Sequence, residues 1–231
     1  MLVWSEMAAA YQYSDEAVTE FTKEWMEIVQ QNYNHPCIIT WTPMNESWGV
    51  HEIETDRMQQ HFTEMIYHLT KSLDPYRPVI VNDGWEHTVS DILTLHEEVG
   101  ETLYKRYTEC KEQILTTEVY HSSVRSAFAN GFRYQGQPIL ISEYGGIAFN
   151  NDGGWGYGNK VSTKEEFLRR FEDITTAVKR IPYCCGFCYT QVSDVQQEIN
   201  GLLDADHNYK LPPEAIREIN ERKVGYWRSE M

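Results

Sequence analysis

Two glutamates follow short apolar runs of the sequence within a few residues. Glu46 comes after the run Ile38–Trp41, and Glu143 comes after Pro138–Ile141. In proteins built on parallel strands, catalytic groups lie at the carboxyl ends of those strands. Either glutamate alone is more typical of a helix N-cap or a surface charge, but the repeated placement predicts that both serve one site. A pair of carboxyl groups at one cleft is typical of sites that catalyse glycoside hydrolysis.

The two roles in that chemistry require different pKa values. One carboxyl group must stay protonated near neutral pH so that it can donate to the leaving oxygen, and the other must be ionised so that it can attack the anomeric carbon or activate water. Burial and a nearby like charge raise the pKa of a carboxyl group, whereas hydrogen bonds to the carboxylate lower it. The two glutamates are therefore expected in different surroundings.

Short apolar runs alternate with longer stretches of helical period. Most of the runs are continuous, as expected of parallel strands covered on both faces. Helices are predicted from an N-cap at Ser14, after Asp56, from a capping box at Ser162 and Glu165, around Leu103–Leu115 and after Pro212. The strands are expected at Leu2–Trp4, Ile38–Trp41, Pro78–Val81, Ile92–Leu95, Pro138–Ile141 and Cys184–Tyr189.

This alternation predicts an α/β fold with one domain over residues 1–231, without a repeat or a linker. A closed (β/α)₈ barrel needs eight strands and typically about 250 residues. The sequence offers six strands and begins inside the first of them. The expected fold is therefore a partial barrel of the (β/α)₈ type, as though the first two units were missing.

Composition excludes several classes of function. The chain has 20 basic and 35 acidic residues, a net charge of −15, so binding to nucleic acid or to an anionic membrane is not expected. No apolar run reaches the roughly 18 residues of a membrane span, and no signal peptide is recognised. An odd number of cysteines, with three crowded into Cys184–Cys188, indicates reduced thiols in a cytoplasmic protein, small core residues on a buried strand.

The sequence contains no spacing typical of a metal or phosphate site. Cys185 and Cys188 lack a second Cys or His pair at ligand spacing. The histidines show no His-x-x-x-His pattern, and no glycine fingerprint of a doubly wound nucleotide-binding sheet follows an early strand. We therefore expect neither a catalytic metal nor a cofactor.

Four motifs follow one another along the sequence. They are Asn34–Trp41 leading to Asn45-Glu46-Ser47, Asn82–Glu86 running on to His96, Pro138–Gly146, and Tyr189-Thr190-Gln191 followed by Asn200-Gly201-Leu202. Together they resemble glycoside hydrolase family 2, the family of β-galactosidases, β-glucuronidases and β-mannosidases. The resemblance implies strands three to eight of a catalytic TIM barrel, whose full-length relatives carry β-sandwich domains upstream.

The resemblance implies a role for each matching residue. Glu46 is the general acid/base and Glu143 the nucleophile of a retaining mechanism, and Asn45 binds the 2-hydroxyl group of the sugar. Further contacts with the nucleophile or the sugar are expected from Tyr144, His96, Asp83, Trp85 and Tyr189. Relatives often read His-Asp-Tyr where this chain has His96-Glu97-Glu98, so the sequence departs from the common pattern here, and a site that uses this tyrosine would have a different local geometry.

The expected substrate is a saccharide with a neutral sugar, a β-galactoside or a related β-glycoside. Relatives specific for glucuronic acid carry an Asn-x-Lys element near the last strand, whereas this chain has Asn200-Gly201-Leu202 there, and Asn208-Tyr209-Lys210 follows too late. The alternative is a catalytically inactive, truncated barrel that binds carbohydrate or assembles with another chain, because open sheet edges favour association. A homo-oligomer or association with the missing barrel and β-sandwich domains fits either interpretation.

Overall fold

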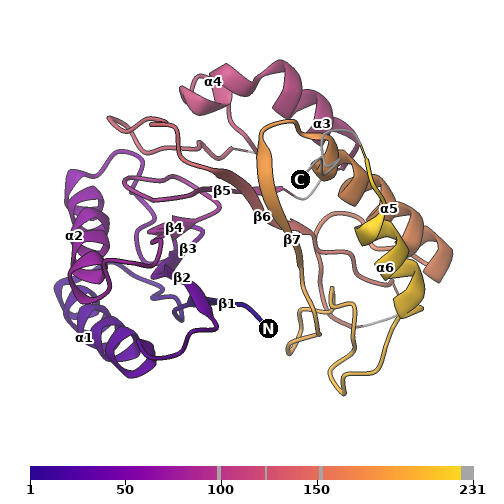
Figure 1. Ribbon diagram of the computed structural model, residues 1–231, viewed down its shortest axis with the longest axis horizontal. Coiled ribbons are helices and arrows are strands. Elements are labelled where there is room, and N and C mark those ends of the chain that lie inside the picture. Colours follow the sequence, from indigo (N-terminus) through magenta and orange to yellow (C-terminus); the bar gives the residue numbers. More distant parts are fainter. Residues whose placement is uncertain (98–99, 123, 151–152, 225–231) are drawn as a thin grey trace. The chain divides into compact units, whose positions relative to one another are not determined.

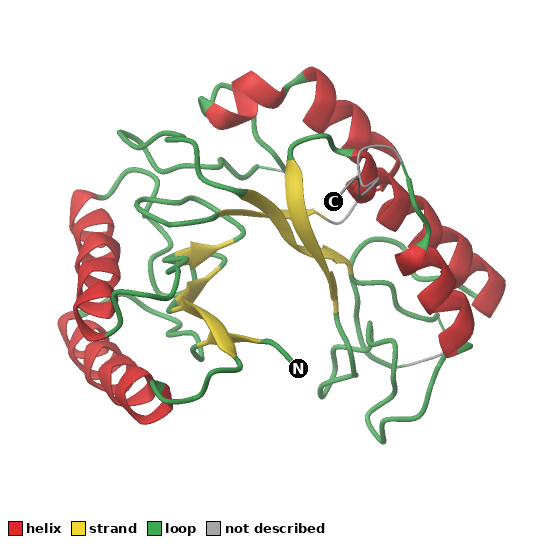
Figure 2. Cartoon of the chain, viewed as in Figure 1, coloured by secondary structure: helices red, strands yellow, loops and turns green. Residues whose placement is uncertain are grey.

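Strands and helices alternate along the chain in the computed structural model (Figures 1 and 2), which describes residues 1–97, 100–122, 124–150 and 153–224. None of the described helices is long and apolar enough to cross a membrane. The elements are β1 Val3–Glu6, α1 Asp15–Asn32, β2 Ile38–Thr42, β3 Met44–Asn45, α2 Arg57–Leu73, β4 Asn82–Asp83, β5 Leu93–Glu97, α3 Gly100–Glu109, α4 Lys111–Leu115, β6 Ile139–Gly145, α5 Lys164–Arg180, β7 Cys184–Thr190 and α6 Pro213–Glu221.

The strands form three short sheets rather than one closed ring, as far as the described residues show. β1 pairs with β2, and β3 pairs with β4, both in parallel. The third sheet has the order β5-β6-β7. The chain divides into two compact units. Unit 1 comprises Met1–Leu95 and Glu112–Leu140, and unit 2 comprises His96–Lys111 and Ile141–Met231. The expected single domain over residues 1–231 stays a prediction.

In unit 1, α1 and α2 pack on the strands through the predicted apolar faces. The side chain of Ser14 accepts a hydrogen bond from the backbone N–H of Ala17, so the predicted N-cap is confirmed. The helix predicted after Asp56 is also confirmed, and the side chain of Asp56 caps it by accepting a hydrogen bond from the N–H of Met58. Trp25 and Trp41 meet edge to face with ring centroids 6.0 Å apart. These side chains form the buried core between the two helices and β2.

The predicted strand Pro78–Val81 is wrong as a regular strand. Trp41 and Val79 form only an isolated parallel bridge, and Ile80 forms an antiparallel bridge with Ser90. The backbone of Trp41 still bonds on this side, donating to Pro78 O and accepting from Ile80 N–H. The return of the chain toward Ser90 replaces a continuous ladder, and regular pairing resumes only at β4.

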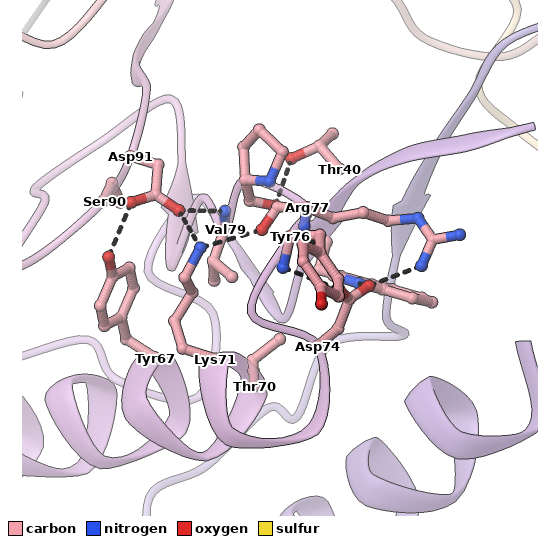
Figure 3. Close-up of polar contacts among 12 residues, drawn as sticks. Thr40, Tyr67, Thr70, Lys71, Asp74, Tyr76, Arg77, Val79, Ser90 and Asp91 are labelled. Carbon is pink, nitrogen blue, oxygen red and sulfur yellow. Dashed lines mark hydrogen bonds and ion pairs between the residues drawn. The ribbon is translucent and has the colours of Figure 1, made fainter. Parts of the chain in front are cut away.

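Buried polar groups join α2 to the amino ends of the strands (Figure 3). The side chain of Asp74 accepts hydrogen bonds from Trp41 Nε1 at 2.9 Å and from Arg77 Nη1 at 2.5 Å. Asp91 accepts from Tyr67 Oη at 2.7 Å and from Lys71 Nζ at 3.1 Å. Each of these two carboxylates accepts hydrogen bonds from several donors, and the bonds connect α2 to the segments that lead into the strands.

In unit 2, α5 covers one face of the sheet through Phe167, Phe171 and Val178. Its capping box lies one residue later than predicted. Thr163 is the N-cap, its side chain accepts from the N–H of Glu166, and the carboxylate of Glu166 accepts from the N–H of Thr163 in return. The sequence permits both pairings, because Ser162 and Thr163 each have a glutamate three residues later.

Two predicted helices and the interpretation of the cysteines can also be compared with the structure. The predicted helix around Leu103–Leu115 is two helices, because α3 ends before Cys110 and α4 begins after it. The helix after Pro212 is confirmed, with Pro213 in its first turn. The interpretation of the cysteines as core residues holds for Cys184 but is wrong for Cys185 and Cys188, which are exposed on β7, an outer strand in the order of its sheet.

Candidate active site

Unit 1 gathers acidic and amide side chains at the carboxyl ends of its strands. Asn45 at the end of β3 pairs in register with Asp83 at the end of β4. The backbone N–H of Glu46 donates to Asp83 O at 2.9 Å. Three of the predicted site residues, Asn45, Glu46 and Asp83, are therefore neighbours at one edge.

Glu6 is a fourth polar residue at this edge, and the sequence reasoning missed it. It ends β1, where it pairs with Thr42. A carboxylate oxygen of Glu6 and one of Asp83 lie within 4.8 Å of each other. The signal that could have found Glu6 is the one that found Glu46, namely an acidic residue within a few positions after a short apolar run.

The Glu46 backbone has a left-handed conformation. Its φ angle is 51°, and that of Ser47 is 57°. Residues other than glycine adopt this region at a cost of about 1–2 kcal/mol each. Such strained turns persist only where the surroundings hold them, and they cluster at functional sites.

Asn45 and Trp85 differ in how the protein surrounds them. The Oδ1 atom of Asn45 is buried and has no hydrogen-bond partner among the described residues. An acceptor in this state needs a donor, which a hydroxyl group can supply.

The indole ring of Trp85 is partly buried, and the guanidinium carbon of Arg125 lies 3.6 Å from its ring centroid. One face of this predicted stacking residue is thus covered by a cation–π contact.

Unit 2 brings together two of the predicted site residues, His96 and Glu143. They lie on the neighbouring strands β5 and β6, with His96 Nε2 at 3.8 Å from Glu143 Oε1. The side chain of His96 is 5% exposed and that of Glu143 is 25% exposed. The buried histidine therefore lies beside the carboxyl group of Glu143, and a protonated imidazole at this place favours the ionised carboxylate.

Tyr144 and Tyr189 lie in the core beneath α5. The Tyr144 hydroxyl is 3.0 Å from Thr175 Oγ1 on α5, and the Tyr189 hydroxyl accepts from the N–H of Ile147 at 3.1 Å. The two rings meet edge to face at 5.6 Å, and burial raises the pKa of both phenols. Tyr144 is buried, whereas Tyr189 is only partly buried.

A glycine explains how closely Tyr189 packs. Gly145 has a φ of 95°, and a Cβ atom added there would lie 2.3 Å from the Tyr189 ring. The Tyr189 ring of β7 thus packs closely on β6, the strand that carries Glu143, at Gly145. Tyr144 and Tyr189 support the strand of Glu143, and their predicted contact with the nucleophile or the sugar stays a prediction.

The fold and these residues agree with one family. The chain matches the family described as glycosyl hydrolases family 2, TIM barrel domain, over residues 3–222. It therefore belongs to this family, and the predicted α/β fold of a partial (β/α)₈ barrel is confirmed.

Curated relatives carry two different activities in their names. The β-glucuronidase of Canis lupus familiaris is 27% identical over 139 residues, which cover 58% of this chain and 19% of the relative. The β-galactosidase of Klebsiella pneumoniae is 38% identical over 74 residues, which cover 32% of this chain and 6% of the relative. The aligned parts thus amount to about a fifth of these relatives or less.

Solved structures share the fold over nearly the whole chain. A β-galacturonidase from Eisenbergiella tayi, bound to galacturonate, matches with a TM-score of 0.70 at 19% identity, covering 98% of this chain and 42% of that one. A β-glucuronidase from Bifidobacterium dentium, complexed with coumarin-3-O-glucuronide, matches with a TM-score of 0.67 at 17% identity, covering 98% and 38%. At this identity the likeness shows the fold alone.

Proposed function

We propose that this chain hydrolyses terminal β-glycosidic bonds with retention of configuration. Glu143 is the nucleophile, and Glu46 is the general acid/base. The observation that carries the proposal is that both glutamates stand at the carboxyl ends of barrel strands, within a chain that matches the family from residue 3 to residue 222. Carboxyl-end positions are where barrel enzymes place their catalytic groups.

The reaction has two displacements. In the first, the Glu143 carboxylate attacks the anomeric carbon, the bond to the leaving oxygen breaks, and Glu46 gives that oxygen its proton. In the second, Glu46 takes a proton from water, and the resulting hydroxide attacks the anomeric carbon and releases Glu143. Retaining enzymes of this kind hold the two carboxyl groups about 5–5.5 Å apart, so the proposal requires both glutamates to act on the same bond.

Neighbouring side chains support these roles. The Oδ1 atom of Asn45, which has no partner among the described residues, is suited to accept a hydrogen bond from the sugar 2-hydroxyl group, a contact that strengthens in the transition state. His96 beside Glu143 stabilises the carboxylate when the imidazole is protonated. Asp83, next to Asn45 in register, is a further acceptor for a sugar hydroxyl. Trp85 offers the face of its ring that Arg125 does not cover.

A neutral sugar fits the polar groups near the last strand better than a uronic acid. The only lysine at Asn-x-Lys spacing there is Lys210, and its Nζ lies 2.6 Å from Asp194 Oδ1 and 2.9 Å from Ile199 O. An ammonium already neutralised by a buried carboxylate is poorly suited to bind the carboxylate of a substrate. We therefore propose a β-galactoside or a related neutral β-glycoside.

A second candidate function follows from the lengths of the relatives. The chain covers only 42% and 38% of the two solved structures. A truncated barrel that binds carbohydrate without hydrolysing it, or that assembles with another chain, is therefore the alternative to catalysis.

The test is release of nitrophenol from β-galactoside, β-mannoside, β-glucuronide and β-galacturonide substrates by the purified chain. Glu143→Gln is expected to lower the rate on the order of a thousandfold or more, and Glu46→Gln by roughly 10²–10⁴-fold. Glu27→Gln, at an exposed glutamate of α1, is the matched control and should act like the wild type.

The outcomes separate the candidates. Turnover that both glutamine variants leave unchanged contradicts the assignment of the two glutamates. A cooperatively folded chain that releases no nitrophenol from any substrate supports the inactive alternative. A preference for the glucuronide or galacturonide contradicts the proposed neutral sugar while leaving the reaction type intact.

A further inference from the structure

In the strained turn at Glu46, the backbone N–H groups of Glu46 and of Ser47 both donate hydrogen bonds. The N–H of Glu46 donates to Asp83 O at 2.9 Å. The N–H of Ser47 donates to Asn82 Oδ1 at 2.8 Å, and Asn82 Nδ2 donates to Ser47 Oγ at 3.0 Å. Since Glu46 and Ser47 both have a positive φ, these bonds act at the two residues that need outside support.

A buried carboxylate completes the same network. The Ser47 hydroxyl donates to Glu86 Oε2 at 2.8 Å, and Asn82 Nδ2 also donates to Glu86 O at 2.9 Å. Arg125 Nη1 lies 3.7 Å from Glu86 Oε1. Ser47 is 2% exposed, Asn82 is fully buried and Glu86 is 3% exposed. A network so far removed from water holds one geometry, because leaving any of its members unpaired is costly.

We propose that Asn82, Ser47 and Glu86 are positioning residues that fix the direction of the general acid Glu46. This inference rests on the proposed function, and it adds three residues that the family motifs did not single out for this role. The three residues act on the peptide group between Glu46 and Ser47, whose N–H donates to Asn82, and not on the substrate. A general acid works only within hydrogen-bond reach of the leaving oxygen, and a displacement of about 1 Å can cost about a hundredfold in rate.

The leaving group distinguishes this role from a general loss of stability. A methyl β-glycoside has a basic leaving group and needs proton donation, whereas 2,4-dinitrophenolate departs without it. Ser47→Ala and Asn82→Ala are therefore expected to lower kcat/KM at least tenfold on the methyl glycoside of the preferred sugar. On the dinitrophenyl glycoside the change should stay within about threefold for the glycosylation step.

The matched control is Thr63→Ala in the same unit. Thr63 is fully buried, and its hydroxyl lies 2.7 Å from Thr88 Oγ1. This variant loses a buried hydrogen bond away from Glu46, so the ratio of the two rates should match that of the wild type. Equal losses on both substrates in Ser47→Ala and Asn82→Ala would overturn the positioning role.

Amide hydrogen exchange tests the same idea without turnover. In Asn82→Ala the N–H of Ser47 loses its acceptor, so its exchange should accelerate at least tenfold while amides of α1 stay unchanged. Unchanged exchange at Ser47 overturns the inference even if the enzyme is active. Failure of the proposed function looks different, because Glu46→Gln itself would then show no dependence on the leaving group.

Discussion

The two ends of the strands in unit 1 are built in opposite ways. At the amino ends, Asp74 is completely buried and accepts hydrogen bonds from Trp41, from the Arg77 side chain and from the N–H groups of Tyr76 and Arg77 (Figure 3). Burial raises the pKa of this carboxyl group, but the bonds from Trp41 and Arg77 outweigh burial and lower it overall. The hydrogen bonds to Asp74 therefore favour the folded state with the carboxyl group ionised.

At the carboxyl ends the same unit contains features that oppose folding. Glu46 and Ser47 are left-handed, the carboxylates of Glu6 and Asp83 lie within 4.8 Å of each other, and Asn45 Oδ1 is buried without a partner among the described residues. Strain, like charges and an unpaired acceptor each cost stability.

The difference shows which end is adapted for chemistry. The hydrogen-bonded groups at the amino ends stabilise the fold and so offset the cost of the strained backbone and the unpaired acceptor at the carboxyl ends. The comparison predicts that substitutions at the amino ends lower stability and leave activity alone, while substitutions at the carboxyl ends lower activity and have a smaller effect on stability.

The largest expected effect on stability comes from Asp74→Ala. The substitution leaves the Arg77 guanidinium and Trp41 Nε1 without their buried partner, so the free energy of unfolding should fall by about 3–5 kcal/mol. Denaturant titration measures the loss, and kcat/KM of the folded variant should equal that of the wild type. If Asp74→Ala does not fold, Asp74→Asn, which keeps acceptor and shape, should show a smaller loss.

An exposed pair is the control for this effect. Glu20→Ala removes the Lys23 ion pair, in which both side chains are 65% exposed, and should change stability by less than about 0.5 kcal/mol. The pKa of Asp74 is lowered in the folded protein, so its contribution is present above the unfolded pKa of about 3.9 and is lost as pH falls through the folded value. A difference between wild type and Asp74→Ala that does not shrink at low pH contradicts this account.

A smaller effect is expected at the strained turn. Glycine adopts a positive φ without a steric penalty, whereas alanine does not. Glu46→Gly should therefore be more stable than Glu46→Ala by about 1 kcal/mol, although both variants lose activity. Thermal unfolding of the pair measures the difference. Alanine as the more stable variant would show that the turn at Glu46 is not left-handed in solution.

Local sequence signals predicted most of the elements. Ser14 and Asp56 marked helix starts because their side chains satisfy N–H groups only a few residues away. The capping box of α5 moved by one residue because Ser162 and Thr163 compete for adjacent glutamates. Local patterns could not show that the segment at Val79 forms bridges only, since strand pairing depends on residues distant in sequence.

Local sequence signals predicted only part of the candidate site. Apolar runs placed Glu46 and Glu143 at strand ends, and the structure brings His96 to Glu143. Sequence could not show that Tyr189 packs beneath α5, because the face of a strand on which a residue lies depends on register. The Ser47–Glu86 hydrogen bond joins residues 39 positions apart, beyond the reach of any local pattern.

The most direct test of the account is to trap the covalent intermediate. A 2-deoxy-2-fluoro-β-galactoside with a dinitrophenyl leaving group forms the glycosyl-enzyme and slows its hydrolysis, because the fluorine destabilises the positive transition state. The account predicts one added fluorosugar in the intact mass and its location on the peptide that contains Glu143, with no adduct in Glu143→Gln. An adduct on another residue, or hydrolysis of a natural β-glycoside with inverted configuration, would contradict the account.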